Sequence, residues 1–183
     1  MEELFVYALL CGVGFDEYEK YEETLDFLFE NNPDDEMLLD LEYRDRKDAI
    51  IHVNSIMNDY IGDCILFGKC LMKELKDIYT RTEITEFGRK MYELWGVLPD
   101  VIDVEKEPYY TLSYADDCLS FGDEKQCREL YEKMFDYNFD DPPKDEEPQI
   151  NFSYEQNKAG VSAPSDRKRI FKIFQRLYNK LMS

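Results

Sequence analysis

The sequence predicts a mainly α-helical fold, a helical bundle with a small β-hairpin and a C-terminal amphipathic helix. Apolar residues recur every three or four positions over most of residues 1–137, which is the spacing of one face of a helix. One stretch, about residues 109–121, breaks this period and is rich in aromatic residues, which favours a hairpin of two short strands. With 183 residues, 44% of them hydrophobic, the chain is large and apolar enough to bury a core.

The helices in the first half of the chain follow from their apolar spacing and their end signals. Residues 2–11 form a short apolar helix that ends at Gly12. A second helix is expected from its cap at Asp16 to about residue 31. Residues 34–79 keep a helical pattern, and Gly62 leaves open whether one kinked helix or separate helices occupy this stretch.

The second half divides into the end of a body, a linker and a tail. Residues 83–95 predict a helix, and another is expected from Asp123 to about residue 137. We therefore expect an acidic, mostly helical domain over residues 1–137. Residues 138–164 are acidic and contain several prolines, which indicates a linker, and residues 165–183 have the pattern of a basic amphipathic helix capped by Ser165.

The charge of the chain is far from neutral and unevenly distributed. There are 41 acidic and 22 basic residues, a net charge of −19. The first 150 residues hold 39 acidic and 15 basic residues, a net charge of −24, whereas residues 151–183 carry +5. A net charge of roughly 2–8 in magnitude is enough to keep a small domain soluble, and larger values produce self-repulsion in the folded state. The excess favours a function for the acidic residues.

Residue types that serve many enzymes are scarce in this chain. His52 is the sole histidine, and the five cysteines include no CxxC pair, so we expect reduced thiols and neither a metal site nor a cofactor. Pro99-Asp100 with Asp123-Glu124-Lys125 resembles the PD-(D/E)xK nuclease signature. That signature places its second acid on a strand, whereas Asp123 is expected to cap a helix. We therefore expect a protein that is not an enzyme.

The second predicted helix carries acidic residues on the side opposite its apolar stripe. Glu19, Glu22, Glu23, Asp26 and Glu30 share this face, and only Lys20 interrupts the acids of the segment. At a rise of about 1.5 Å per residue, the face presents about one carboxylate per 4 Å, which is comparable to one phosphate per about 3.4 Å along a DNA strand. Asp34, Asp35 and Glu36 continue the series. An ordinary solvated face is one interpretation, and phosphate mimicry is the other.

The basic tail helix is a possible second surface for a partner. Its cations include Arg167, Lys168, Arg169, Lys172 and Arg176. The first three lie near the helix N-terminus, where the macrodipole disfavours positive charge, and the acidic body would oppose direct binding to nucleic acid. Docking of its apolar stripe on the body or on a partner protein is therefore favoured.

Two resemblances point to a phage or another mobile element. Residues 4–61, through Ala8, Gly12, Phe15, Glu17-Tyr18, Tyr21 and Thr24, look like the N-terminal pattern of small phage tail-assembly chaperones. The strongly acidic, aromatic-rich helical body resembles, as a class, the acidic DNA-mimic inhibitors of phages, including anti-CRISPR proteins. This class shares chemistry and no motif, so it implies an inhibitory function and transfers no individual residue.

We therefore expect an inhibitor that binds a basic nucleic-acid-handling effector, such as a CRISPR-Cas nuclease, and blocks its nucleic-acid groove. A phage assembly chaperone or protein–protein adaptor that binds through the tail is one alternative. An immunity protein against a basic toxin is another. The first residues show no basic leader and no apolar run long enough to cross a bilayer, so a cytoplasmic protein without membrane contact is expected, in the bacterial host if the protein is phage-encoded.

Overall fold

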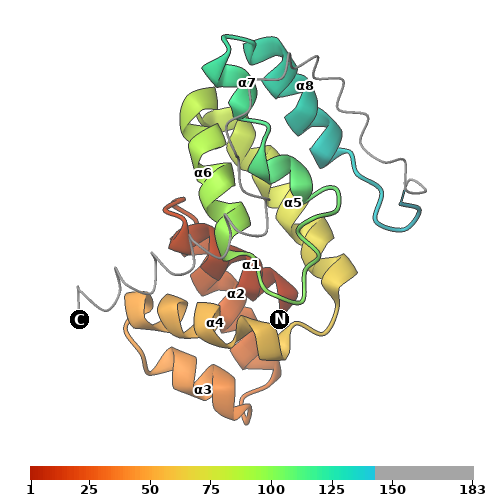
Figure 1. Cartoon of the computed structure of the whole chain (residues 1–183). Coiled ribbons are helices and arrows are strands. Elements are labelled where there is room, and N and C mark those ends of the chain that lie inside the picture. Colours follow the sequence, from red (N-terminus) through yellow and green to blue (C-terminus); the bar gives the residue numbers. More distant parts are fainter. Residues whose placement is uncertain (143–183) are drawn as a thin grey trace. The chain divides into compact units, whose positions relative to one another are not determined.

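The computed structural model describes residues 1–142, and within this range the chain forms eight α-helices, one 3₁₀ helix and no strand. The elements in order are α1 (Glu2–Gly12), α2 (Tyr18–Asn31), α3 (Glu36–Glu42), α4 (Arg46–Tyr60), α5 (Cys64–Arg81), α6 (Ile84–Val97), η1 (Tyr110–Ser113), α7 (Asp117–Ser120) and α8 (Glu124–Phe135) (Figure 1). The predicted mainly helical class is confirmed. The basic helix expected at 165–183, and the linker expected at 138–164 except for its first five residues, lie outside the described residues.

Aspartate caps divide the stretch that the sequence left open into three helices. Asp35, Asp45 and Asp63 precede α3, α4 and α5, and each carboxylate accepts hydrogen bonds from two backbone amides of the helix that follows. Asp123 caps α8, as expected, with its carboxylate accepting one hydrogen bond, from the Gln126 amide. The cap predicted for α2 is wrong by one position, because Glu17 precedes this helix and makes no side-chain cap bond.

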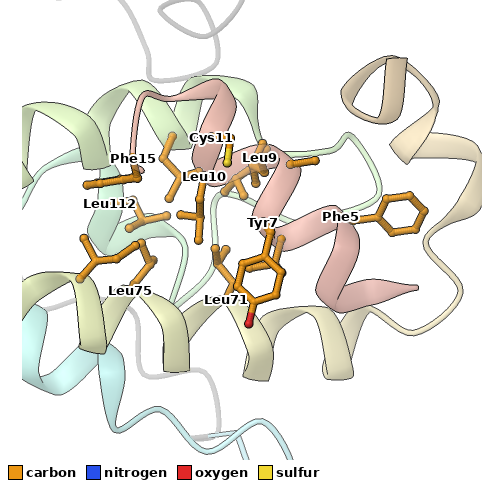
Figure 2. Close-up of a cluster of buried hydrophobic side chains, with 14 of the residues drawn as sticks. Phe5, Tyr7, Leu9, Leu10, Cys11, Phe15, Leu71, Leu75 and Leu112 are labelled. Carbon is orange, nitrogen blue, oxygen red and sulfur yellow. The ribbon is translucent and has the colours of Figure 1, made fainter. Parts of the chain in front are cut away.

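The core is built around α1, which is buried from Leu4 to Cys11. A helix that is apolar on all sides cannot rest on a single neighbour. Accordingly, α1 contacts α2, α4, α5 and α6. Figure 2 shows the side chains of α1 next to Leu71 and Leu75 of α5, with Phe15 and Leu112 in the same cluster. Burial of α1 therefore determines how the surrounding helices are arranged.

One lysine joins α2 to α5 beside this core. The Nζ atom of Lys20 lies 2.6 Å from a carboxylate oxygen of Glu74 and 3.3 Å from one of Glu17. Glu17 and Glu74 are only 2% and 5% exposed, so each needs a cation to offset the loss of its hydration. Arg81 also pairs with Glu17, and the Lys20 ammonium group lies over the Tyr7 ring of α1. We call Glu17, Lys20, Glu74 and Arg81 the α2–α5 ion cluster.

The ionisation of Lys20 shows how this cluster depends on pH. Burial alone would lower the pKa of Lys20, but the hydrogen bond and the charge of Glu74 outweigh it and raise this pKa above its ordinary value. A folded-state pKa above that of lysine in the unfolded chain means that the contribution is complete at neutral pH. It is lost only as the solution becomes strongly alkaline.

The predicted hairpin at about residues 109–121 is wrong, because this segment forms η1 and α7. Aromatic composition favoured strands, but the buried positions Tyr109, Leu112, Ala115 and Cys118 are three residues apart. This is the period of a 3₁₀ helix, whereas strands require alternation. Several backbone hydrogen bonds of this segment also join residues three apart, such as the bond that the Leu112 amide donates to the Tyr109 carbonyl.

Two glycines within helices allow residues from later in the chain to approach closely. At Gly68 of α5, a Cβ atom would clash with the Phe139 ring and with the Tyr109 hydroxyl oxygen. At Gly88 of α6, a Cβ atom would lie 2.9 Å from the Cβ atom of Asp116. These glycines are therefore needed for packing, which explains why α5 and α6 accept a residue of low helix propensity.

Replacing Gly68 tests this packing directly. Gly68→Ala should lower the free energy of unfolding by about 1–2 kcal/mol. Overpacking of this kind costs roughly 1–3 kcal/mol, and the higher helix propensity of alanine offsets up to about 1 kcal/mol of this cost. Gly62→Ala is the matched control, since its Cβ atom would meet only a Glu2 carboxylate oxygen at 3.8 Å. Urea unfolding of both variants measures the difference. Equal stability of the two variants would contradict the close approach at Gly68.

The α2–α5 ion cluster makes a second prediction. Lys20→Met should lower the free energy of unfolding by about 2–3 kcal/mol. This is less than the roughly 3–5 kcal/mol lost when a fully buried ion pair is broken, because Glu17 still pairs with Arg81. Adding Glu74→Gln should recover part of the loss, since the carboxylate left without its main cation is removed. Lys125→Met is the control, because the Lys125 side chain is 88% exposed. Thermal and urea unfolding of the wild type, Lys20→Met, Glu74→Gln, the double variant and Lys125→Met measure this, and purely additive effects would show that Lys20 and Glu74 are not coupled.

Candidate functional site

The acidic face predicted on the second helix is present on α2. Tyr21 and Leu25 are the buried side of this helix. On the other side, Glu19, Glu23, Asp26 and Glu30 are exposed, and none of the four has an ion-pair partner within residues 1–142. Their spacing places all four within a narrow arc of the helix surface. The structure therefore brings these four predicted residues together.

Lys20, the one basic residue between positions 19 and 36, faces away from these carboxylates. Its ammonium group belongs to the α2–α5 ion cluster and contacts Glu74 of α5 at 2.6 Å. The sequence suggested that Lys20 interrupts the acidic series, but in the structure it neutralises buried acids instead. Consequently, it provides no compensating positive charge for the exposed side of α2.

Glu22 differs from the other predicted residues of α2. It is half-buried at the edge of the acidic face and pairs with the Arg46 guanidinium group of α4. That guanidinium also lies over the Tyr18 ring, with its central carbon 5.6 Å from the ring centroid. Glu22 thus has a contact that helps to hold α2 against α4, and it is the weakest of the five as a candidate for partner binding.

The three acids predicted beyond α2 lie at the turn into α3 and have different local roles. The Asp35 carboxylate caps α3, accepting bonds from the Met37 and Leu38 amides at 2.9 and 3.1 Å. Glu36 occupies the first turn of α3, where the macrodipole favours negative charge. Asp34 is exposed and makes neither a cap bond nor an ion pair within the described residues. Folding therefore explains Asp35 and Glu36 but not Asp34.

We define the acidic surface as Glu19, Glu23, Asp26, Glu30 and Asp34. Its members repel one another, since neighbours spaced three or four residues apart on a helix cost a few tenths of a kcal/mol per like-charged pair. Glu30 also lies in the last turn of α2, at the negative end of the helix dipole. Glu23, Asp26 and Glu30 therefore do not stabilise α2, and Asp34 lies in the turn that follows this helix.

An exposed aromatic residue adjoins the acidic surface, and the sequence analysis missed it. Phe27 of α2 is 64% exposed and follows Glu23 by four residues and precedes Glu30 by three. The signal for it was available, because Phe27 falls outside the apolar stripe of its helix. An aromatic ring beside carboxylates provides a surface on which a guanidinium group can stack while it pairs with an acid.

The described residues also bear on the other chemistries considered from the sequence. Within residues 1–142, no three His, Cys, Asp or Glu side chains are grouped as a metal site would require. Asp123 caps α8 and therefore lacks the strand position of a PD-(D/E)xK acid. No helix in this range is long and apolar enough to pass through a membrane. The basic residues of the tail, Arg167, Lys168, Arg169, Lys172 and Arg176, lie outside the described residues.

Comparisons of the chain with protein-family models, with curated proteins and with solved structures find no match.

Proposed function

We propose that this protein is a non-enzymatic inhibitor whose acidic surface occupies the nucleic-acid groove of a basic effector. The single observation that carries the proposal is the pairing of Lys20 with the buried Glu17 and Glu74, which leaves Glu19, Glu23, Asp26 and Glu30 exposed and without an ion pair in the described part of the chain. A row of carboxylates of this kind presents negative charge at a spacing similar to that of phosphates.

The energetic argument supports a function for these carboxylates in binding. Like charges along one helix face lower its stability, and solubility alone does not require a net charge of −19. A partner whose groove is lined by Lys and Arg would convert this repulsion into attraction. Charge complementarity also accelerates the encounter, and the attraction is screened over about 8 Å at physiological salt.

The effector class that fits this surface is a nucleic-acid-binding protein such as a CRISPR-Cas nuclease, in keeping with the resemblance to acidic phage inhibitors. An immunity protein against a basic toxin would use the same electrostatics. The adaptor or assembly-chaperone alternative differs, because its partner would bind the tail at residues 165–183 and not the acidic surface. These alternatives make opposite predictions for charge changes on α2.

Charge reversal on α2 is the first test. The triple variant Glu23→Lys, Asp26→Lys, Glu30→Lys should bind its effector at least about 30-fold more weakly, or about 2 kcal/mol, because each exposed pair contributes roughly 0.2–1 kcal/mol and reversal adds repulsion. Binding to purified Cas nucleases and other nucleic-acid-binding proteins is measured at low and high salt after nuclease treatment. Displacement of the effector's DNA is followed in parallel.

The matched control is a second triple reversal of equal charge elsewhere on the body. Asp59, Glu105 and Glu132 are exposed and have no ion pair within residues 1–142, so changing all three to Lys alters the net charge equally. This control should keep most of its affinity. If both triple variants lose affinity alike, net charge alone is responsible. If neither does, and deletion of residues 165–183 abolishes binding, the adaptor alternative replaces our proposal.

Two neighbouring acids separate binding from folding. Asp35→Ala should lower stability by about 1 kcal/mol, because it removes the cap of α3, and should change effector affinity little. Asp34→Ala should leave stability within about 0.5 kcal/mol, since exposed positions without contacts tolerate substitution, and should weaken effector binding. Urea unfolding and binding are measured on the same preparations. If Asp34→Ala lowers stability and leaves effector affinity unchanged, Asp34 does not belong to the acidic surface.

A further inference from the structure

The body contains a groove whose chemistry is opposite to that of the acidic surface. The groove has a volume of about 450 Å³, within the range of roughly 300–1,000 Å³ typical of ligand sites. It lies between the outer face of α5 and the segment that begins at the end of α8. The residues that matter here are the α5 lysines Lys69, Lys73 and Lys76 and the opposing aromatic residues Phe135, Tyr137 and Phe139.

The groove combines a row of cations with an aromatic wall. The three lysines are spaced i, i+4 and i+7, so they project from one face of α5. The Phe135 ring is anchored in the body by the Tyr79 ring, with centroids 5.3 Å apart, and Tyr137 packs edge-on against Phe139. Asp77 also lines the groove, but it contacts Lys20 and Arg81. An anionic ligand with an apolar part fits this combination.

The chain itself shows how such a ligand is bound. After α8, the Asp136 carboxylate lies 2.9 Å from the Lys76 ammonium group, and the Asp140 carboxylate accepts hydrogen bonds from Lys69 at 2.8 Å. Between these two contacts, the Phe139 ring lies against α5 at Gly68. Residues 136–140 are thus an acidic segment with an aromatic side chain that binds the lysine face of α5.

Lys73 is the lysine that this segment leaves available. It lies between Lys69 and Lys76 on the same face, and its side chain is 75% exposed. Its one ion-pair contact within residues 1–142 is a Glu74 oxygen at 3.5 Å, and the other oxygen of that carboxylate already lies 2.6 Å from Lys20. Lys73 can therefore accept a carboxylate from another molecule without disrupting the fold.

We propose that this groove binds a short acidic segment of a partner protein, with a carboxylate on Lys73 and an aromatic or aliphatic side chain against Phe135 and Tyr137. A short peptide suits the groove better than nucleic acid because the adjoining residues 136–140, themselves acidic and aromatic, bind two lysines of the same face through carboxylates. A short peptide also carries fewer charges than a polynucleotide, so it is repelled less by a body whose first 150 residues carry a net charge of −24. The groove adds a second binding surface that the proposed inhibitory function does not require.

Binding of a defined peptide tests this proposal. The probe is an acetylated, fluorescein-labelled peptide with the sequence Glu-Phe-Glu-Glu-Leu-Glu, titrated with the full chain and followed by fluorescence anisotropy. We expect saturable binding that Lys73→Glu weakens at least tenfold. Lys125→Glu is the matched control, because Lys125 is also a well-exposed lysine, on α8 and outside the groove, and this variant should change the affinity less than twofold. Circular dichroism verifies that both variants are folded.

Four results would overturn the proposal. The first is the absence of saturable binding by the peptide, and the second is an equal loss for Lys73→Glu and Lys125→Glu, which would indicate only general attraction to cations. The third is tighter, Lys73-dependent binding of a single-stranded oligonucleotide of equal charge, which would make nucleic acid the ligand. The fourth is Lys73-dependent dimerisation in sedimentation experiments, which would make a second copy of the chain the occupant.

Discussion

Burial of α1 is the constraint on which the rest of this structure depends. Because Leu4 to Cys11 are all buried, this helix requires neighbours on every side, and α2, α4, α5 and α6 supply them. The surrounding helices direct apolar residues toward α1, and α6 also packs against η1, so that the remaining sides of these helices are available for charge. The high proportion of acidic residues is compatible with folding for this reason, since almost all of them can lie on the outer sides.

The ion cluster between α2 and α5 gives the outer side of α2 its electrostatic character. Glu17 and Glu74 are buried and need cations, and Lys20 serves both. The same lysine is the only basic residue within the acidic series of residues 19–36. A structural requirement inside the body therefore removes the cation that would otherwise compensate the exposed carboxylates. Stability and a strongly negative surface have the same origin here.

The helices could be predicted from the sequence because they depend on local periodicity and on capping residues, as with Asp63 before α5 and Asp123 before α8. The segment at 109–121 was misjudged because its composition favours strands, whereas packing against the body imposes a period of three. Of the eight acidic residues predicted to form a binding face on and after the second helix, all but Glu22 are exposed. The pairing of Glu22 with Arg46 could not be foreseen, because it joins positions 24 residues apart and depends on how α2 lies against α4.

The groove was beyond sequence analysis for the same reason. Lys69, Lys73 and Lys76 are three of only 15 basic residues among the first 150, and in the sequence they are ordinary members of an exposed helix face. They become part of a groove only because the segment after α8 lies against α5, where Asp136 pairs with Lys76 and Asp140 with Lys69. Asp77 lines this groove and also contacts Lys20 of the ion cluster. The lysine face is therefore in direct contact with the ion cluster that pairs α2 with α5, through Asp77 and Lys20.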